Sequence, residues 1–415
     1  MFRRKTHHYA YGSLNSNTRS YTRSRRPIFF IIIGILLIVG IAILLNLTRI
    51  RLAFKGYSLT QQSEILSLKH GDTVIILKEE KLDHISDWIQ TSTDVSYYNE
   101  FEKYYTLHPK STIDEVVETV TVIMQRDYDA LLKLGYEEES IWSLLETQTI
   151  DDLNYLVDHK LTYDMIKGYR DVKGFKASLM ASYQKVYSKV KSYNYAVGII
   201  TYPMIDSSNK SDEQYQITNP KENLTLVKKG MTLSKNYEPD DLVSPSKTGI
   251  QAAKDCDDPK LRKEAYKALS KMAADARKEK LYILINSGYR SYTDQKKTYL
   301  SFKRKYGTVY AKAHVALPGS SEHQTGLGVD LTARRVEKGQ AAVFGDTPEY
   351  KWVVKNAASY GFILRFPEKR SKMTGIATEP WHFRYVGKEA AKEIYENDWT
   401  LEEYCLYKGV IPEVK

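Results

Sequence analysis

The sequence predicts an α+β fold for the C-terminal half of this 415-residue chain, preceded by a mainly helical region and an apolar N-terminal segment. Three observations predict this arrangement. After about residue 260, short apolar runs of strand length are separated by amphipathic stretches, without the regular rhythm of a parallel strand–helix–strand fold. Residues 52–195 contain few glycines or prolines and are typical of helices. Residues 27–48 are almost wholly apolar and uncharged. A chain of this length predicts two or three domains.

The apolar segment predicts a single transmembrane anchor. Residues 27–48 are long enough to cross the hydrocarbon core of a bilayer. A cleaved signal peptide is the alternative, but its apolar part would be shorter and a small-residue cleavage site should follow, which is not found here. Residues 1–26 contain seven Lys or Arg and no acid, so we expect a disordered tail. The positive-inside rule then places the N-terminus in the cytoplasm and the chain after residue 50 outside.

The basic tail also explains the net charge. The chain carries +10 in total and the tail supplies seven of these charges, so the other 389 residues carry only +3. A basic domain can indicate a nucleic-acid partner, but here the excess lies beside the predicted anchor. The composition therefore gives no reason to expect nucleic-acid binding.

Residues 49–204 form the predicted helical region. It contains a weak internal repeat, in which Gly56-Tyr57 and Gly135-Tyr136 each precede a helix-like stretch, so two copies of a small helical hairpin are expected. Tyrosines recur along the region, and helix packing explains them better than a glycan-binding surface. Residues 205–222 are polar and aperiodic and predict a linker or domain-edge loop. Residues 223–415 would then form the C-terminal domain.

The elements of this domain begin with an amphipathic helix. Apolar residues recur at steps of three and four, which gives one apolar stripe: Leu261, Ala265, Leu269, Met272 and Ala276. Residues 281–285 predict a buried strand, and the chain turns out of it through 287–291. Arg290 is therefore expected at a strand end, where a rigid scaffold can orient it. A second helix is predicted from Thr293, a residue type suited to an N-cap, with Gln295 in its first turn.

The remaining elements are shorter. Residues 351–360 predict a helix ended by Gly361, residues 362–366 a strand, and residues 388–397 and 401–407 two closing helices. The two cysteines, Cys256 and Cys405, lie outside the predicted membrane, where a disulfide between them is permitted. Two separate thiols are the alternative. Neither cysteine has the spacing of a metal site.

Two polar stretches carry the candidate chemistry: SEHQTGLGVD at residues 321–330 and EPWH at residues 379–382. His323, Asp330 and His382 would supply the three His and carboxylate ligands that a catalytic zinc usually takes, leaving a position for water. Glu379 would then be the base that takes a proton from that water. Each of these residues alone could be structural, so the prediction depends on the cluster.

The spacing sets the local structure. His323 and Asp330 are seven residues apart, which on an unbroken strand directs them to opposite faces. Gly326 and Gly328 argue against a helix there. We therefore expect a turn or bulge at the glycines, with Asp330 on the strand that follows. Pro380 favours an extended backbone at the residue before it, so a tight turn should lead into a strand at residues 383–386.

These segments resemble a known family. Together with Ser287-Gly288-Tyr289-Arg290-Ser291, the stretches SEHQTGLGVD and EPWHFRYVG are similar to the signatures of VanY-type and LdcB-type zinc carboxypeptidases, the D-alanyl-D-alanine carboxypeptidase-like metallopeptidases of peptidase family M15B. The resemblance covers roughly residues 220 to 415. It implies a mainly antiparallel central sheet flanked by helices, and a zinc enzyme that trims peptidoglycan stem peptides at the outer face of a bacterial cell membrane.

The resemblance also implies roles for single residues. His323, Asp330 and His382 match the zinc ligands and Glu379 the base. Three further positions match residues that contact the substrate in this family. Arg290 matches the arginine that binds the carboxylate or the developing oxyanion of the substrate, and Gln295 and Ser321 match positions that contact its terminal residues. The chain departs from the family at two positions. Gly328 replaces a usual Ala, which is expected to be harmless, and Phe366 replaces a frequent Tyr, which removes a hydroxyl near the substrate.

Three functions follow from the sequence. The first is a D,D-carboxypeptidase that removes the terminal D-alanine of pentapeptide stems. The second is an L,D-carboxypeptidase acting on tetrapeptide stems, since the same motifs serve both. The third is a membrane-anchored wall-binding protein without turnover, which the complete set of ligands disfavours. Protein partners are not indicated by the sequence.

Overall fold

The computed structural model describes residues 26–208, 213–246, 248–411 and 413–415. The chain divides into two compact units, Met1–Gln125 and Arg126–Lys415. The predicted cytoplasmic tail lies outside the described residues except for its last residue. The division falls inside the predicted helical region and not at residues 205–222. The domain boundaries drawn from the sequence stay predictions.

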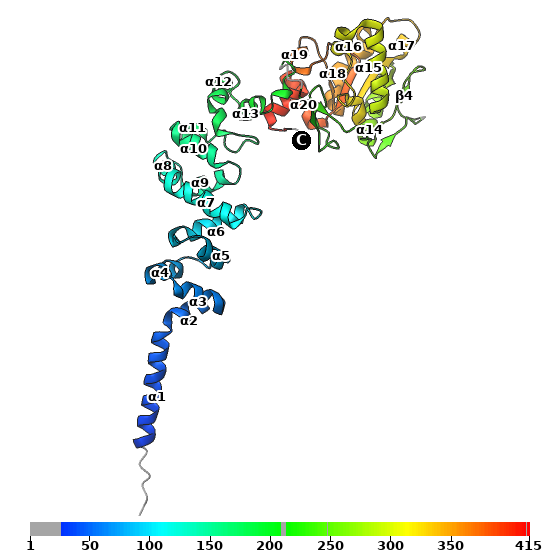
Figure 1. Ribbon diagram of the computed structural model, residues 1–415. Coiled ribbons are helices and arrows are strands. Elements are labelled where there is room, and N and C mark those ends of the chain that lie inside the picture. Colours follow the sequence, from blue (N-terminus) through cyan, green and yellow to red (C-terminus); the bar gives the residue numbers. More distant parts are fainter. Residues whose placement is uncertain (1–25, 209–212, 247, 412) are drawn as a thin grey trace, which may run out of the picture. The chain divides into compact units, whose positions relative to one another are not determined.

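The first unit begins with one apolar helix and a short helix that contains two arginines. The helix α1 spans Arg26–Leu45 and α2 spans Leu47–Phe54 (Figure 1). Among the described residues, no single helix is long and apolar enough to cross a membrane; Phe29–Leu45 and α2 meet that condition only together, bent by 64°. The side chain of Asn46 donates a hydrogen bond to the carbonyl of Ala42, which ends α1 at the bend. The span predicted over 27–48 is therefore divided between two helices at Asn46.

The rest of the first unit is a set of short helices around one aromatic core. Ser58 and Thr112 form capping boxes at the starts of two of them, as expected for helices that begin with Ser or Thr. Trp88, Tyr98 and Phe101 are buried at the centre. The helices are α3 (Leu59–Ser67), α4 (His70–Lys78), α5 (Ile85–Thr91), α6 (Tyr98–Leu107) and α7 (Ile113–Val122).

The second unit also starts with helices. They are α8 (Tyr128–Lys133), α9 (Glu138–Leu145), α10 (Ile150–Asp158), α11 (Tyr163–Ile166), α12 (Met180–Val190) and α13 (Tyr193–Thr201). The predicted repeat is present as local geometry. Gly56 and Gly135 both have positive φ, and the amide of each following tyrosine donates to a carbonyl five residues earlier. Both tyrosines are buried, which agrees with a packing role.

A five-stranded sheet forms the centre of the second unit. Its order is β4 (Gln251–Ala252), β6 (Ile283–Ser287), β7 (Gly328–Ala333), β9 (His382–Tyr385) and β8 (Phe362–Leu364). The β4–β6 pair is parallel and the other three pairs are antiparallel. The helices around the sheet are α14 (Lys263–Lys278), α15 (Tyr292–Tyr306), α16 (Thr308–His314), α18 (Pro348–Asn356), α20 (Lys388–Asn397) and α21 (Leu401–Lys408) (Figure 1). The predicted α+β class is confirmed.

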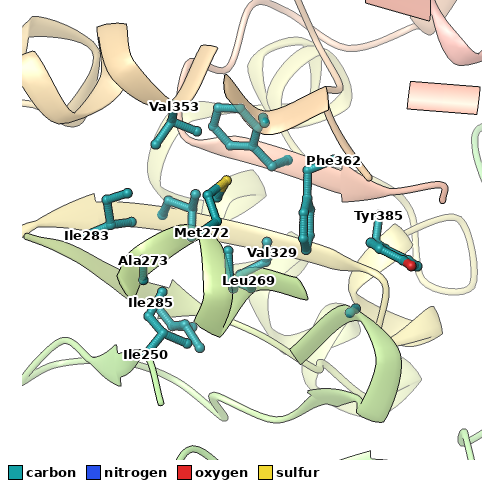
Figure 2. Close-up of a cluster of buried hydrophobic side chains, with 14 of the residues drawn as sticks. Ile250, Leu269, Met272, Ala273, Ile283, Ile285, Val329, Val353, Phe362 and Tyr385 are labelled. Atoms are coloured by element: carbon teal, nitrogen blue, oxygen red, sulfur yellow. The ribbon is translucent and has the colours of Figure 1, made fainter. Parts of the chain in front are cut away.

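The main core lies between α14 and the sheet. Figure 2 shows Leu269, Met272 and Ala273 of α14 directed toward Ile283 and Val329 of the strands. The predicted apolar stripe is thus the buried face of α14, except that Leu261 belongs to a two-residue strand, β5 (Leu261–Arg262), before the helix. The strand predicted at 281–285 lies two residues later. These shifts are of the size expected at element ends.

A second core covers the other face of β8. Phe362 belongs to the main core, whereas its neighbour Ile363 packs with Leu401 and Leu406 of α21, because successive strand residues face opposite sides. The segment predicted as a linker contributes Ile205 and Ile217 to this second core, so its described part is packed. Cys405 is buried here, and both cysteines are free, so the disulfide is not formed.

Short elements complete the second unit. β1 (Tyr215–Gln216) pairs in parallel with β2 (Met231–Thr232), and β3 (Leu242–Val243) pairs antiparallel with β5. Two four-residue helices, α17 (Arg334–Glu337) and α19 (Ser371–Thr374), lie in the connections that follow β7 and β8.

Candidate metal centre

Two adjacent strands and one short turn place the three candidate ligands together. Asp330 on β7 lies directly opposite His382 on β9 in the antiparallel register, so their side chains are cross-strand neighbours. His323 lies in the 3-10 turn Glu322–Thr325, which ends at Gly326 with φ of +67°. This is the glycine turn that the sequence predicts. The candidate ligand atoms of His323, Asp330 and His382 lie within 4.8 Å of one another.

The hydrogen bonds of the two histidines fix how they face Asp330. His323 Nδ1 lies 2.6 Å from the carbonyl oxygen of Gly288, which can only accept, so this nitrogen carries the proton. Its Nε2 is thus left facing Asp330 Oδ2 at 3.4 Å. His382 faces the other carboxylate oxygen, with Nδ1 2.8 Å from Asp330 Oδ1. Two nitrogens and a carboxylate converge on one point.

The donor set fits zinc. Two imidazole nitrogens and one carboxylate match the usual ligands of a catalytic zinc site. All three side chains are largely buried, and their candidate donor atoms crowd together within 4.8 Å, an arrangement that a bound cation would stabilise. Burial disfavours the charged carboxylate, but the two histidines outweigh it and hold the pKa of Asp330 well below its ordinary value. Asp330 is thus ionised, as a candidate ligand must be.

Glu379 lies beside this cluster. Its backbone amide donates to Phe366, and its carbonyl accepts from the His382 amide, which forms the tight turn predicted before β9. Burial raises the pKa of the Glu379 carboxyl to about 7; His382 and Arg290 oppose the rise, and Asp330 adds to it. A carboxyl with a pKa near neutrality can both accept and release a proton.

Arg290 follows β6, as predicted for a strand end. Its guanidinium donates to Gln295 Oε1 at 3.1 Å and to Ser287 Oγ at 2.8 Å, while its buried Nε has no hydrogen-bond partner. Gln295 is itself fixed by a bond to the Ala316 carbonyl. The prediction that α15 starts at Thr293 was wrong by two residues: Ser291 is the N-cap and its hydroxyl accepts from the Asp294 amide. Gln295 still lies in the first turn.

One cleft of about 570 Å³ contains every site residue that the sequence predicts. Ser321 is buried at its wall, and the Phe366 ring lies 5.0 Å from the His382 ring. His314 also lines the cleft, and its ring stacks on Tyr310. The structure thus brings the predicted residues together, and their catalytic roles stay predictions.

The sequence reasoning missed a set of buried charges behind the ligands. They are Lys228, Glu322, Arg365, Arg384 and Glu402, each at most 4% exposed. A signal was present in the sequence. Arg365 and Arg384 each interrupt an otherwise apolar strand, where a charge is found only with a partner. Their partners come from distant segments and could not be identified without the fold.

Known proteins were compared with this chain. The family model described as VanY, D-alanyl-D-alanine carboxypeptidase, matches residues 258–388. The putative carboxypeptidase YodJ of Bacillus subtilis is 45% identical over 195 residues, which cover 47% of this chain and 71% of that protein. The bifunctional D-Ala-D-Ala dipeptidase and carboxypeptidase VanXYC of Enterococcus gallinarum is 37% identical over 186 residues, covering 44% of this chain and 94% of that protein.

Solved structures were found as well. The LdcB LD-carboxypeptidase is 42% identical, with 49% of this chain and 94% of that chain covered and a TM-score of 0.43. A mutant of the D,D-pentapeptidase VanY in complex with Zn(II) is 31% identical, with 44% and 98% covered and a TM-score of 0.37. The matches to YodJ and VanXYC cover most of the length of those two proteins, and this similarity is sufficient to assign the family. This chain belongs to the VanY family of D-alanyl-D-alanine carboxypeptidases, which are hydrolases.

Proposed function

We propose that this protein is a membrane-anchored zinc D,D-carboxypeptidase that removes the terminal D-alanine from peptidoglycan stem peptides outside the bacterial cell. The observation that carries the proposal is a single cleft with three convergent ligand side chains, a carboxyl whose pKa is about 7, and an arginine held by two hydrogen bonds. The name of VanXYC, which includes D-Ala-D-Ala carboxypeptidase, supports the D,D specificity.

The residues of the cleft divide the chemistry between them. His323, Asp330 and His382 would hold a zinc ion, which when bound polarises a carbonyl and lowers the pKa of a water molecule. Glu379 takes the proton of the attacking water and passes it to the departing amine, for which a pKa near 7 is well suited.

Arg290 supplies the positive charge that the substrate requires. Its guanidinium, oriented by Gln295 and Ser287, binds the terminal carboxylate or the developing oxyanion. Ser321 lies on the same wall of the cleft and would contact the terminal residue. A free carboxylate at the end of the substrate is what distinguishes a carboxypeptidase from an endopeptidase.

The membrane anchor is the second part of the proposal. Apolar side chains from Phe29 to Leu45 are exposed along α1, as expected for a helix that faces lipid. With the basic tail in the cytoplasm, the peptidase domain would lie at the cell wall, where its substrate is found.

The test uses the full chain in detergent and defined stem peptides. Pentapeptide and tetrapeptide are incubated with the zinc-loaded and the chelator-treated protein, and released D-alanine is measured. Chelator-sensitive release from the pentapeptide is the expected result, whereas release from the tetrapeptide alone would replace D,D with L,D specificity. No release from either peptide by zinc-loaded protein would refute carboxypeptidase action on these stems and favour a wall-binding role for the helical region.

A further inference from the structure

A network of buried charges lies directly behind the ligand His382. Glu322 Oε1 accepts a hydrogen bond from Arg365 Nε at 2.8 Å and lies 2.9 Å from Arg384 Nη1. The other side of the Arg365 guanidinium donates two bonds to the carboxylate of Glu402 on α21, at 2.7 and 3.0 Å. Glu402 in turn lies 3.1 Å from Lys228 Nζ. The network thus links the turn that carries His323 to the C-terminal helix.

Among the buried atoms here that have no hydrogen-bond partner, two face each other. They are Glu322 Oε2 and His382 Nε2, both buried and 3.5 Å apart. Leaving a buried polar atom unpaired costs about 1 to 3 kcal/mol. A purely structural pairing of Glu322 with the two arginines would not require its second oxygen to face a metal ligand. The arrangement is therefore built for His382.

The nitrogen that faces Asp330 is the one that His382 can offer to a metal. That atom is Nδ1, 2.8 Å from Asp330 Oδ1. To offer a lone pair there, the ring must lose the Nδ1 proton to solvent and keep the Nε2 proton. A metal-bound histidine usually donates its other N–H to a carboxylate or a carbonyl, which fixes the tautomer and the ring orientation. His323 meets this need through Gly288, and His382 requires another acceptor.

We infer that Glu322 is a positioning residue that holds His382 in the Nε2-protonated tautomer, so that Nδ1 is free for the metal. Arg365 and Arg384 both contact the other oxygen, Glu322 Oε1, and so fix the direction of the carboxylate. Glu402 on α21 pairs with the positive charge of Arg365, and Lys228 pairs with Glu402 in turn. Glu322 acts through His382, which its unpaired oxygen faces. This inference rests on the metal site of the proposed function.

The test compares two variants that make the same chemical change in the same network. Glu322→Gln replaces the acceptor that faces His382 by an amide that can present N–H, which favours the wrong tautomer. Glu402→Gln alters the network on the far side of Arg365, where nothing contacts a ligand. Zinc affinity of the full chain in detergent is measured by competition with a chelator of known affinity, and folding is followed by thermal unfolding of the metal-free protein.

The inference predicts that Glu322→Gln lowers zinc affinity by about 10- to 100-fold. Glu402→Gln should keep an affinity close to that of the unchanged chain, although both variants lose thermal stability. Equal affinity losses in both variants would show that Glu322 matters only for the fold, and an unchanged affinity in Glu322→Gln would also overturn the inference. Failure of the unchanged chain to bind zinc would instead refute the proposed function.

A second measurement needs no variant, should Glu322→Gln fail to fold. In the zinc-loaded unchanged chain with ¹⁵N-labelled histidine, the ring signals that respond to zinc report which nitrogen carries a proton. The expected result is one ring protonated at Nδ1, as His323 requires, and one protonated at Nε2, as Glu322 requires of His382. Two zinc-responsive rings both protonated at Nδ1 would refute the role of Glu322.

Discussion

Replacing Glu379 with glutamine should make the metal-free protein more stable at alkaline pH while removing its activity. The pKa of Glu379 is about 7 in the folded protein, whereas its ordinary value is 4.5. Between pH 4.5 and pH 7, this carboxyl is therefore protonated in the folded protein and ionised in the unfolded chain. Stability therefore falls as pH rises from 4.5 to 7, and the full cost persists above 7. At about 1.4 kcal/mol per pH unit, the upper limit of this cost is about 3 kcal/mol.

The half-buried position of Glu379 at the cleft wall allows some screening by solvent, so we expect about 2 kcal/mol. Glutamine has the same shape without the charge and escapes this cost. Thermal unfolding of chelator-treated full-length protein is compared at pH 5 and pH 8, where the variant should gain about 4 to 8 °C at the higher pH only. Glu368→Gln, a change at an exposed glutamate, is the control. A difference between Glu379→Gln and the unchanged chain that does not grow with pH would refute the reasoning.

Three further predictions concern the metal, the substrate and the packing of the site. Asp330→Asn removes an ionised ligand shared between two histidines, so zinc affinity measured by chelator competition should fall by more than about 100-fold; unchanged affinity would exclude Asp330 as a ligand. Arg290→Lys keeps the charge but loses the planar fork that bonds Gln295 and Ser287, so kcat/KM for D-alanine release should fall by about 100-fold or more with zinc content unchanged; normal kinetics would contradict this role. Gly328→Ala places a Cβ atom 3.0 Å from Cβ of Glu322, so thermal unfolding should show a loss of about 1 kcal/mol, in contrast to the harmless change expected from the sequence; equal stability would show that the turn can move.

The local pattern of the sequence is sufficient for much of this architecture. The stripe on α14, the buried strand before Arg290 and the glycine turn after His323 follow from periodicity and backbone preference, which act over a few residues. Element ends were less well predicted, because competing caps decide them: Ser291 and not Thr293 starts α15. The strand order depends on long-range pairing and was not deduced from the residues. The same is true of the register that places Asp330 of β7 opposite His382 of β9.

The metal ligands and the charges behind them differ in how visible they are in a sequence. His323, Asp330, Glu379 and His382 stand in polar stretches with a recognisable order, so the resemblance to a family identifies them together. One partner of Arg365 is Glu402 on the last helix, and no local pattern connects an arginine at the end of β8 with a helix glutamate 37 residues later. Only the fold shows that both are buried and paired.

The central claim is that three ligands hold a catalytic zinc and that Glu379 moves the proton. The most direct test is D-alanine release from a pentapeptide stem by the zinc-loaded full chain and by Glu379→Ala, with the zinc content of both measured in the same samples. The account predicts equal zinc content and a rate that is lower by about 100- to 10,000-fold in the variant. A variant that contains zinc and releases D-alanine as fast as the unchanged chain would contradict it.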